Sequence, residues 1–160
     1  MTCYSVSEKR FRLAGMRILG VDFGRRRIGL ALSDATATLA RPWRVIAAGA
    51  TPVASADQLA AIIAESRSRP DDDIDIGAVV VGLPRRLNGE DTDQTQPARD
   101  FARHLETITG LGVRLQDERL TSREAESRLA ERERDWRRRK PRLDAAAAAI
   151  ILQDYLDGPK

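Results

Sequence analysis

The sequence predicts a single α/β domain with a mixed five-stranded sheet in the order 3-2-1-4-5 and helices on both faces. Two observations lead to this class. Near its start the chain has two apolar strands joined by a turn of a few residues, and so short a connection can join only antiparallel neighbours. Further along, two strands are each reached through a helical segment, which is typical of parallel strands. Right-handed crossovers then place the fourth strand beside the first.

Three short apolar runs predict the antiparallel part of the sheet. Ile18–Phe23 is the first strand, the turn Gly24–Arg27 follows, and Ile28–Ser33 is the second strand. Trp43–Ala47, which comes after Pro42, is the third strand. The first strand is therefore central, with neighbours on both sides.

The middle of the chain alternates between helix and strand. Leu59, Ile62 and Ile63 share one helical face and predict a helix within about Val53–Ser68. The continuous apolar run Ala78–Leu83 is typical of a strand buried on both faces. A polar loop follows, and then apolar residues at helical spacing predict a second helix: Phe101, Leu105 and Ile108.

The end of the chain predicts one more strand and two helices. Val113–Asp117 is the fifth strand, and Thr121 with Glu124 three residues later forms a capping box that starts a helix. Arg137–Arg142 contains a proline, so we expect a basic loop there. The last helix is expected over about Asp144–Leu156.

The first residues differ from the rest of the chain. Residues 1–15 show no clear period and precede a second methionine, Met16, so we expect a flexible extension ahead of one domain over residues 16–160. The longest apolar run, Ala145–Leu152, is far shorter than the roughly 18 residues that span a bilayer, and no signal peptide opens the chain. We therefore expect a cytoplasmic protein with no membrane span.

Composition narrows the chemistry. Hydrophobic residues make up 42% and charged residues 32% of the 160, which is enough apolar mass for a core. The only cysteine, Cys3, excludes an intrachain disulfide and a thiolate zinc site, and the only histidine, His104, excludes a multi-histidine metal site. Any catalysis must rest on carboxylates, hydroxyls and arginines.

Basic charge is concentrated near the end of the chain. The formal net charge is +3, from 27 basic and 24 acidic residues. Residues 119–142 hold ten basic and five acidic residues, so this stretch carries +5 and the rest of the chain −2. Such a patch can follow a phosphate backbone by releasing its counterions. The alternative is an ordinary solvated helix face.

Two aspartates stand where the predicted fold would bury them. Asp22 belongs to the central strand, where an unpaired carboxylate is costly unless it is hydrogen-bonded or binds a cation. Its alternative role is to cap the turn at Gly24. Asp144 shares one helical face with Ala148 and Ile151, so it points inward or at the edge of the sheet. Its alternative role is that of a helix N-cap.

A third acidic position, Asp117-Glu118, closes the fifth strand at its carboxyl end, where open α/β sheets gather their sites. Because side chains alternate along a strand, only one of the two can point toward Asp22, and the residues alone leave open which. A plain loop is the alternative. Carboxylates without His or Cys suit Mg²⁺ or Mn²⁺, and two such ions about 4 Å apart can clamp the reacting oxygens of a phosphodiester. Beside a basic stretch, this set indicates nuclease chemistry.

Four stretches resemble the YqgF family, whose members are described as Holliday junction resolvases and as pre-16S rRNA nucleases. In chain order they are Gly20–Asp34, Gly82–Pro84 with Asn88-Gly89, Asp117–Ser122, and Asp144–Gln153. Their order and spacing also match, and the resemblance covers about Met16–Leu156. The first sixteen residues and the arginine-rich stretch Arg137–Arg142 depart from the family's pattern.

The resemblance implies a ribonuclease H-like fold and assigns roles to single residues. Asp22, Glu118 and Asp144 would be the catalytic, metal-binding triad, with Mg²⁺ or Mn²⁺ at a two-ion site. This favours Glu118 over its neighbour Asp117. Arg27 takes the family's basic position in the first motif and is a candidate phosphate contact. The other candidate nucleic-acid-binding residues belong to the basic stretch: Arg119, Arg123, Arg137, Arg138, Arg139, Lys140 and Arg142.

The expected function is a metal-dependent endonuclease acting on structured nucleic acid, foremost on the 5′ end of precursor 16S ribosomal RNA, with 5′-phosphate and 3′-hydroxyl products. RNA and ribosomal particles are the expected partners of a monomer or homodimer. One alternative is a resolvase of four-way DNA junctions, which would be a symmetric dimer.

Two further alternatives are weaker. A non-cleaving factor in transcription or ribosome assembly would have no use for inward acids, which repel phosphate. An actin-like ATPase or sugar kinase, whose phosphate loop also begins like Asp22-Phe23-Gly24, would need two such sheet domains.

Removal of residues 1–15 is expected to leave the fold intact, because no predicted element includes them. Circular dichroism melting of the truncated and full chains checks this. Loss of the cooperative melting transition would contradict the assigned domain boundary.

Overall fold

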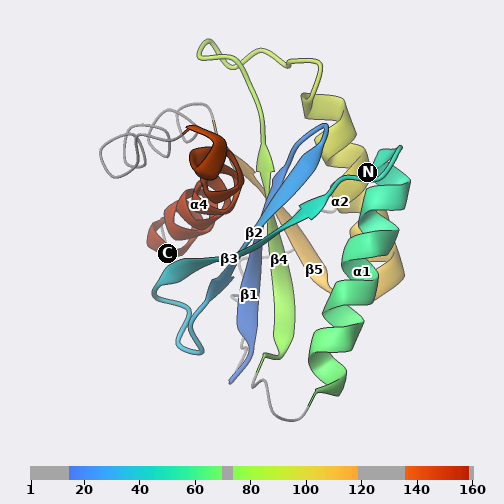
Figure 1. The fold of residues 1–160 in the computed structure, drawn as a ribbon, viewed down its shortest axis with the longest axis vertical. Coiled ribbons are helices and arrows are strands. Elements are labelled where there is room, and N and C mark those ends of the chain that lie inside the picture. Colours follow the sequence, from blue (N-terminus) through green and yellow to red (C-terminus); the bar gives the residue numbers. More distant parts are fainter. Residues whose placement is uncertain (1–14, 70–73, 119–135, 159–160) are drawn as a thin grey trace.

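The computed structural model describes residues 15–69, 74–118 and 136–158, and within the last range it describes side chains from residue 144 onward. It contains a five-stranded sheet in the order β3-β2-β1-β4-β5, which confirms the predicted order (Figure 1). The strands are β1 (Arg17–Phe23), β2 (Arg27–Ser33), β3 (Ala40–Ala47), β4 (Ile76–Leu83) and β5 (Gly112–Asp117). The helices are α1 (Pro52–Ser68), α2 (Thr95–Thr109) and α4 (Trp136–Asp157).

The pairing of the strands follows from the connections between them. β1 pairs with β2 and β2 with β3 in antiparallel fashion, while β1 with β4 and β4 with β5 are parallel. Helices α1 and α2 lie together on one face of the sheet, and α4 lies on the other (Figure 1). Local signals start the first helix, since the Thr51 side chain accepts a hydrogen bond from the Ala54 amide at 3.1 Å and Pro52 occupies the first turn.

Two expected boundaries were wrong, both at prolines. β3 begins at Ala40 and contains Pro42, because an edge strand pairs on one side only and tolerates a missing amide donor. Helix α4 begins at Trp136, so Arg137–Arg142 lies in its first turns and is not a loop. A proline costs a helix one backbone hydrogen bond but does not forbid it.

Some expectations fall outside the described residues. These are nearly all of the expected extension, residues 1–15, and the helix expected at Thr121 and Glu124. Within the described part of the chain, no helix combines the length and apolarity that crossing a membrane requires.

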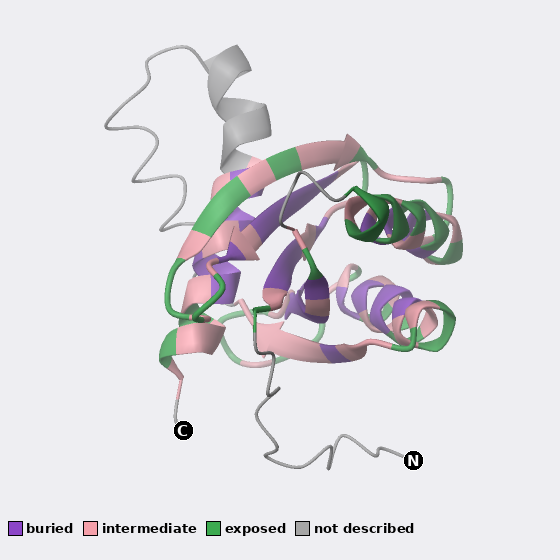
Figure 2. Cartoon of the chain, turned by 90° about the horizontal axis from the view of Figure 1, so that it is seen from below, coloured by how far each residue is buried: buried purple, intermediate pink, exposed green. Residues whose placement is uncertain are grey.

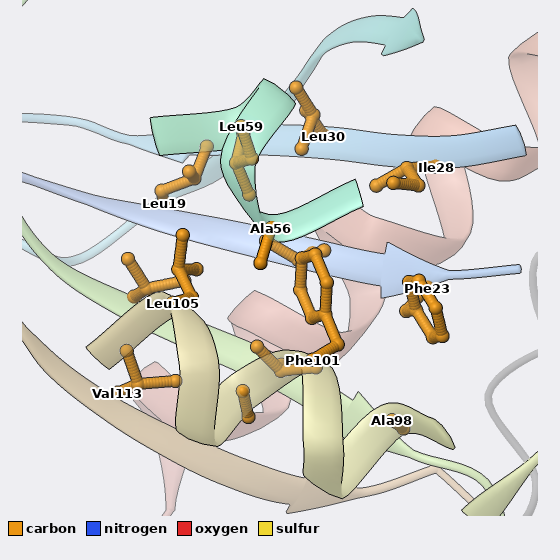
Figure 3. Packing of buried hydrophobic residues seen from close by; sticks show 14 of the residues in the cluster. Leu19, Phe23, Ile28, Leu30, Ala56, Leu59, Ala98, Phe101, Leu105 and Val113 are labelled. Carbon is orange, nitrogen blue, oxygen red and sulfur yellow. The ribbon is translucent and has the colours of Figure 1, made fainter. Parts of the chain in front are cut away.

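Large side chains fill the layer between the sheet and helices α1 and α2. The rings of Phe23 and Phe101 stack with centroids 4.6 Å apart, and Leu19, Leu59 and Leu105 are fully buried around them (Figure 3). Figure 2 shows the buried residues concentrated in the strands and on the inward faces of the helices. This layer buries most of the large apolar side chains and therefore supplies most of the hydrophobic stabilisation.

The layer between the sheet and α4 combines larger side chains, such as Ile151 and Leu152, with small ones that let the helix come close. Ala31, Ala78 and Val80 pack there against Ala148 and other residues of the helix. At Gly29 of β2, an added Cβ would stand 1.9 Å from the Asp144 carbonyl oxygen, and at Gly20 of β1 it would stand 2.7 Å from the Leu152 Cβ. Glycine is needed at these two positions because the helix lies almost against the strand backbones.

The variant Gly29→Ala should destabilise the protein by about 3 kcal/mol, since the new methyl group would overlap a backbone oxygen that cannot move without displacing α4. Urea unfolding measures this. Gly158→Ala, where the nearest atom lies 3.3 Å from the added Cβ, is the control and should change stability by less than about 0.5 kcal/mol. Equal stabilities of the two variants would show that the close contact has no energetic weight.

Candidate active site

Asp22 lies on the face of the sheet that α4 covers. Along β1, Ile18, Gly20 and Asp22 alternate with the large core residues of the opposite face. The antiparallel partner of Asp22 is Gly29, whose missing side chain leaves room for the carbonyl of Asp144. The structure thus brings Asp22 of β1 close to Asp144 of α4.

Glu118 reaches the same face from β5. Gln116 is the partner of Gly82 on β4, so the side chain two residues further on returns to this face, and that of Asp117 does not. The Glu118 amide donates to the carbonyl of Leu83 at 3.3 Å. A Cβ at Gly82 would stand 2.7 Å from the Glu118 Oε2 atom, so here too a glycine makes the room.

Asp144 forms an ion pair with Arg27, the first residue of β2. The Arg27 Nε atom lies 3.0 Å from the Asp144 Oδ2 atom, and both side chains are about 30% exposed. Arg27 is two residues before Gly29 on the same strand face, which is why it reaches the helix. The guanidinium thus places a positive charge against one of the three acids.

Burial and mutual repulsion raise the pKa values of the other two acids. Burial raises the pKa of Asp22 from its usual 3.8 to about 7, with a further contribution from the negative charge of Asp144. Burial likewise raises the pKa of Glu118 from 4.5 to about 8, helped by Asp22 and then by Asp117. Two carboxyl groups that resist ionisation side by side favour a proton or a cation between them.

The donor chemistry of this cluster fits a hard divalent cation. Its oxygen atoms belong to the carboxylates of Asp22, Glu118 and Asp144. As the side chains stand, however, no group of three or more acidic, histidine or cysteine residues among those described could hold a metal ion. Asp144 is engaged by Arg27, so a cation would have to share it with the guanidinium.

The predicted basic residues are placed only in part. Arg27 stands within the cluster, whereas Arg119 and Arg123 lie outside the described residues. Arg137–Arg139, Lys140 and Arg142 belong to the first turns of α4, and their side chains also lie outside the description.

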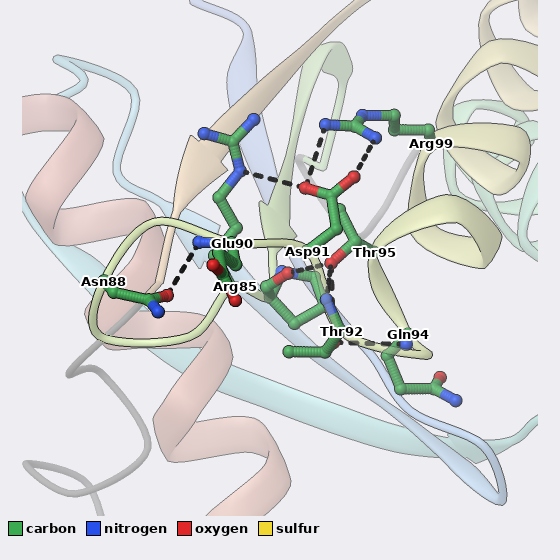
Figure 4. A network of polar contacts seen from close by, with 9 residues as sticks. Arg85, Asn88, Glu90, Asp91, Thr92, Gln94, Thr95 and Arg99 are labelled. Atoms are coloured by element: carbon green, nitrogen blue, oxygen red, sulfur yellow. Dashed lines mark hydrogen bonds and ion pairs between the residues drawn. The ribbon is translucent and has the colours of Figure 1, made fainter.

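Sequence reasoning missed one element beside the cluster. The loop after β4 is an ordered hairpin tied to α2 by Asp91 and Thr95, with Arg85 and Arg99 on either side of Asp91 (Figure 4). Its Asn88-Gly89 turn was the only local signal, because the partners of Asp91 become neighbours only when β4 and α2 pack.

A mixed sheet in the order β3-β2-β1-β4-β5, with α1 and α2 on one face and α4 on the other, is the fold of the ribonuclease H-like class of proteins. T. thermophilus RuvC, solved in complex with Holliday junction substrate, has a similar fold with a TM-score of 0.50. It is 16% identical, and the match covers 88% of this chain and 93% of that one.

The family described as RuvX, Holliday junction resolvase, matches residues 16–158, and the chain belongs to this family. A protein of Anaeromyxobacter sp. (strain Fw109-5) named "Putative pre-16S rRNA nuclease" is 44% identical over 143 residues, which are 89% of this chain and 98% of that protein. A protein of Pelotomaculum thermopropionicum with the same name is 39% identical over 142 residues, 89% of this chain and 87% of its own. The predicted family resemblance is confirmed.

The metal-free protein should lose stability as the pH rises from 5 to 9. The pKa values of Asp22 and Glu118 are higher in the folded than in the unfolded chain, so their contribution is fully present below about pH 4 and is lost as the pH passes about 7 and about 8. Thermal melting in a chelating buffer measures this fall. The double variant Asp22→Asn, Glu118→Gln should show a flatter profile over the same range, and an equally steep one would contradict the assignment.

Proposed function

We propose that this protein is a metal-dependent endonuclease that hydrolyses phosphodiester bonds in structured RNA, at the 5′ end of precursor 16S ribosomal RNA. The observation that carries the proposal is the meeting of two half-buried carboxyl groups, Asp22 and Glu118, at one end of the sheet, where desolvation raises their pKa values. The names of the relatives supply the RNA substrate.

Asp22, Glu118 and Asp144 would hold Mg²⁺ or Mn²⁺, with two ions as the expected number. When bound, such an ion supplies positive charge that offsets the negative charge developing on the reacting phosphate. Asp22 has the central position because it stands on the middle strand of the sheet, between its two partners. The raised pKa values mean that Asp22 and Glu118 release protons when the cation arrives, so binding should strengthen with pH.

Arg27 has two parts to play in this proposal. Its Nε atom holds the carboxylate of Asp144 in place. Its guanidinium also carries two terminal nitrogens, and their forked geometry suits the oxygens of a phosphate group. Arg27 would thus position both an acid and the substrate. The arginines and lysine of the basic stretch would bind flanking phosphates.

Hydrolysis then adds water across the phosphodiester. The water oxygen forms the new bond to phosphorus, the bond from phosphorus to the 3′ oxygen breaks, and that oxygen takes up a proton. The products are a 5′-phosphate and a 3′-hydroxyl end, as the family resemblance implies.

The second candidate substrate is a four-way DNA junction. It is favoured by the description of the family and by the fold shared with RuvC. The two candidates differ in symmetry, because a resolvase must cut two strands as a symmetric dimer, whereas cleavage of a single RNA strand needs one site. We place either activity in the cytoplasm, with ribosomal particles as a partner of the RNA activity.

Asp22→Asn should abolish cleavage and retain or strengthen binding, since the amide cannot supply the charge that a cation needs but no longer repels phosphate. The test uses end-labelled precursor ribosomal RNA and a four-way DNA junction, each with Mg²⁺, Mn²⁺ or a chelator. Asp100→Asn, at an exposed position of α2, is the matched control and should cut normally. If wild type and Asp22→Asn both bind and neither cuts, the protein is a binding factor and the proposal fails.

A further inference from the structure

The loop between β4 and α2 is a hairpin with its own internal structure. We call residues 84–94 the β4–α2 hairpin. Arg85 and Asp91 form an antiparallel bridge, and the Arg86 amide donates to the Glu90 carbonyl at 2.8 Å. The Gly89 amide donates back to the Arg86 carbonyl at 2.8 Å. These bonds close the loop on itself and give its tip a defined position.

The base of the hairpin is fastened to α2. The carboxylate of Asp91 lies 2.9 Å from the Arg99 Nη1 atom and 3.8 Å from the Arg85 Nε atom (Figure 4). The buried hydroxyl of Thr95 donates to the Pro84 carbonyl and accepts from the Thr92 amide at 2.8 Å. Asp91 and Thr95 thus fasten the base of the hairpin to α2, and the hairpin projects from this base.

The hairpin borders the candidate active site on two sides. Leu83, the residue before it, accepts the hydrogen bond of the Glu118 amide. Asp93, near its end, lies 3.7 Å from Arg25 in the turn that follows Asp22. In Figure 1 the yellow-green segment between β4 and α2 extends beyond the end of the sheet. The base of the hairpin therefore lies beside the acids, and its tip projects from the same end of the sheet.

The tip presents an apolar side chain beside a basic one. Leu87 is 59% exposed, the highest value among the large hydrophobic residues described, and Arg86 next to it is also exposed. A leucine gains nothing from phosphates, so its only apolar partners in a nucleic acid are base and sugar faces. Stacking hides the faces of the bases in a duplex. At unpaired nucleotides the bases can unstack, and their faces become accessible.

We propose that Leu87 packs against an unstacked base next to the scissile phosphate while Arg86 contacts an adjoining phosphate, so that the enzyme selects sites where a paired stem meets a single strand. This inference rests on the proposed function and names the feature of the substrate that the same site reads.

The test measures binding of the full chain in an Asp22→Asn background, so that no cleavage intervenes. One probe is an RNA stem with a single-stranded 5′ extension that carries 2-aminopurine as its first unpaired base, and the other is the same stem with a blunt end. Leu87→Ser should weaken binding of the extended stem about fivefold and leave the blunt stem unchanged. The rise in 2-aminopurine fluorescence on binding should disappear, and Leu87→Met should restore both signals.

Leu39→Ser is the matched control. Leu39 is 55% exposed and follows β2 at the end of the sheet away from Arg27, so its replacement should change neither probe. The proposal is overturned if Leu87→Ser weakens both probes equally, if it weakens neither, or if Leu39→Ser has the same effect.

Cleavage by the otherwise wild-type chain separates this inference from the function on which it rests. Cleavage of both RNA probes with an unchanged ratio in Leu87→Ser overturns the hairpin's role and leaves the nuclease. A lost binding preference in Leu87→Ser without cleavage by the wild type supports the hairpin's role and overturns the nuclease. Absence of RNA binding by the wild type overturns both.

Discussion

The close contact between α4 and the glycines of the sheet is the constraint on which the candidate site depends. The Asp144 carbonyl occupies the space that a side chain at Gly29 would need, and Gly29 is the strand partner of Asp22. Asp144 of α4 therefore lies directly beside Asp22 of the central strand. On β4, the other neighbour of β1, the missing side chain of Gly82 likewise leaves room for the carboxylate of Glu118. A larger residue at Gly29 or Gly82 would push α4 away from the sheet and would move the three acids apart.

One of the two layers supplies most of the stability of the fold, and the other carries the candidate site. On the face of α1 and α2, large side chains such as Phe23 and Phe101 interlock, and their burial stabilises the fold. On the face of α4, small residues let backbones approach but bury less area, and the same face carries acids whose desolvation opposes folding. A site that costs free energy in this way is tolerated because the opposite layer offsets it.

The candidate site concentrates negative charge, and the phosphate groups of a nucleic acid are negative as well. Arg27 neutralises Asp144, whereas burial and repulsion keep Asp22 and Glu118 reluctant to ionise without a cation. A cation in the cluster would relieve that repulsion and at the same time attract a phosphate. The β4–α2 hairpin stands beside this cluster with Asp91 paired to Arg85 and Arg99 at its base, while Arg86 and Leu87 at its tip are exposed.

The sequence by itself determined the strand order, because connection length and apolar periodicity are local properties, and it marked Asp22 as an acid in a buried strand. It also carried the motifs of the family. Only the tertiary structure decided that α4 continues across its proline, that Arg27 pairs with Asp144, and that Asp91 ties the hairpin to α2. These features depend on how closely layers approach and in which register strands pair, and no single stretch of sequence encodes either. That Asp22, Glu118 and Asp144 hold metal stays a prediction.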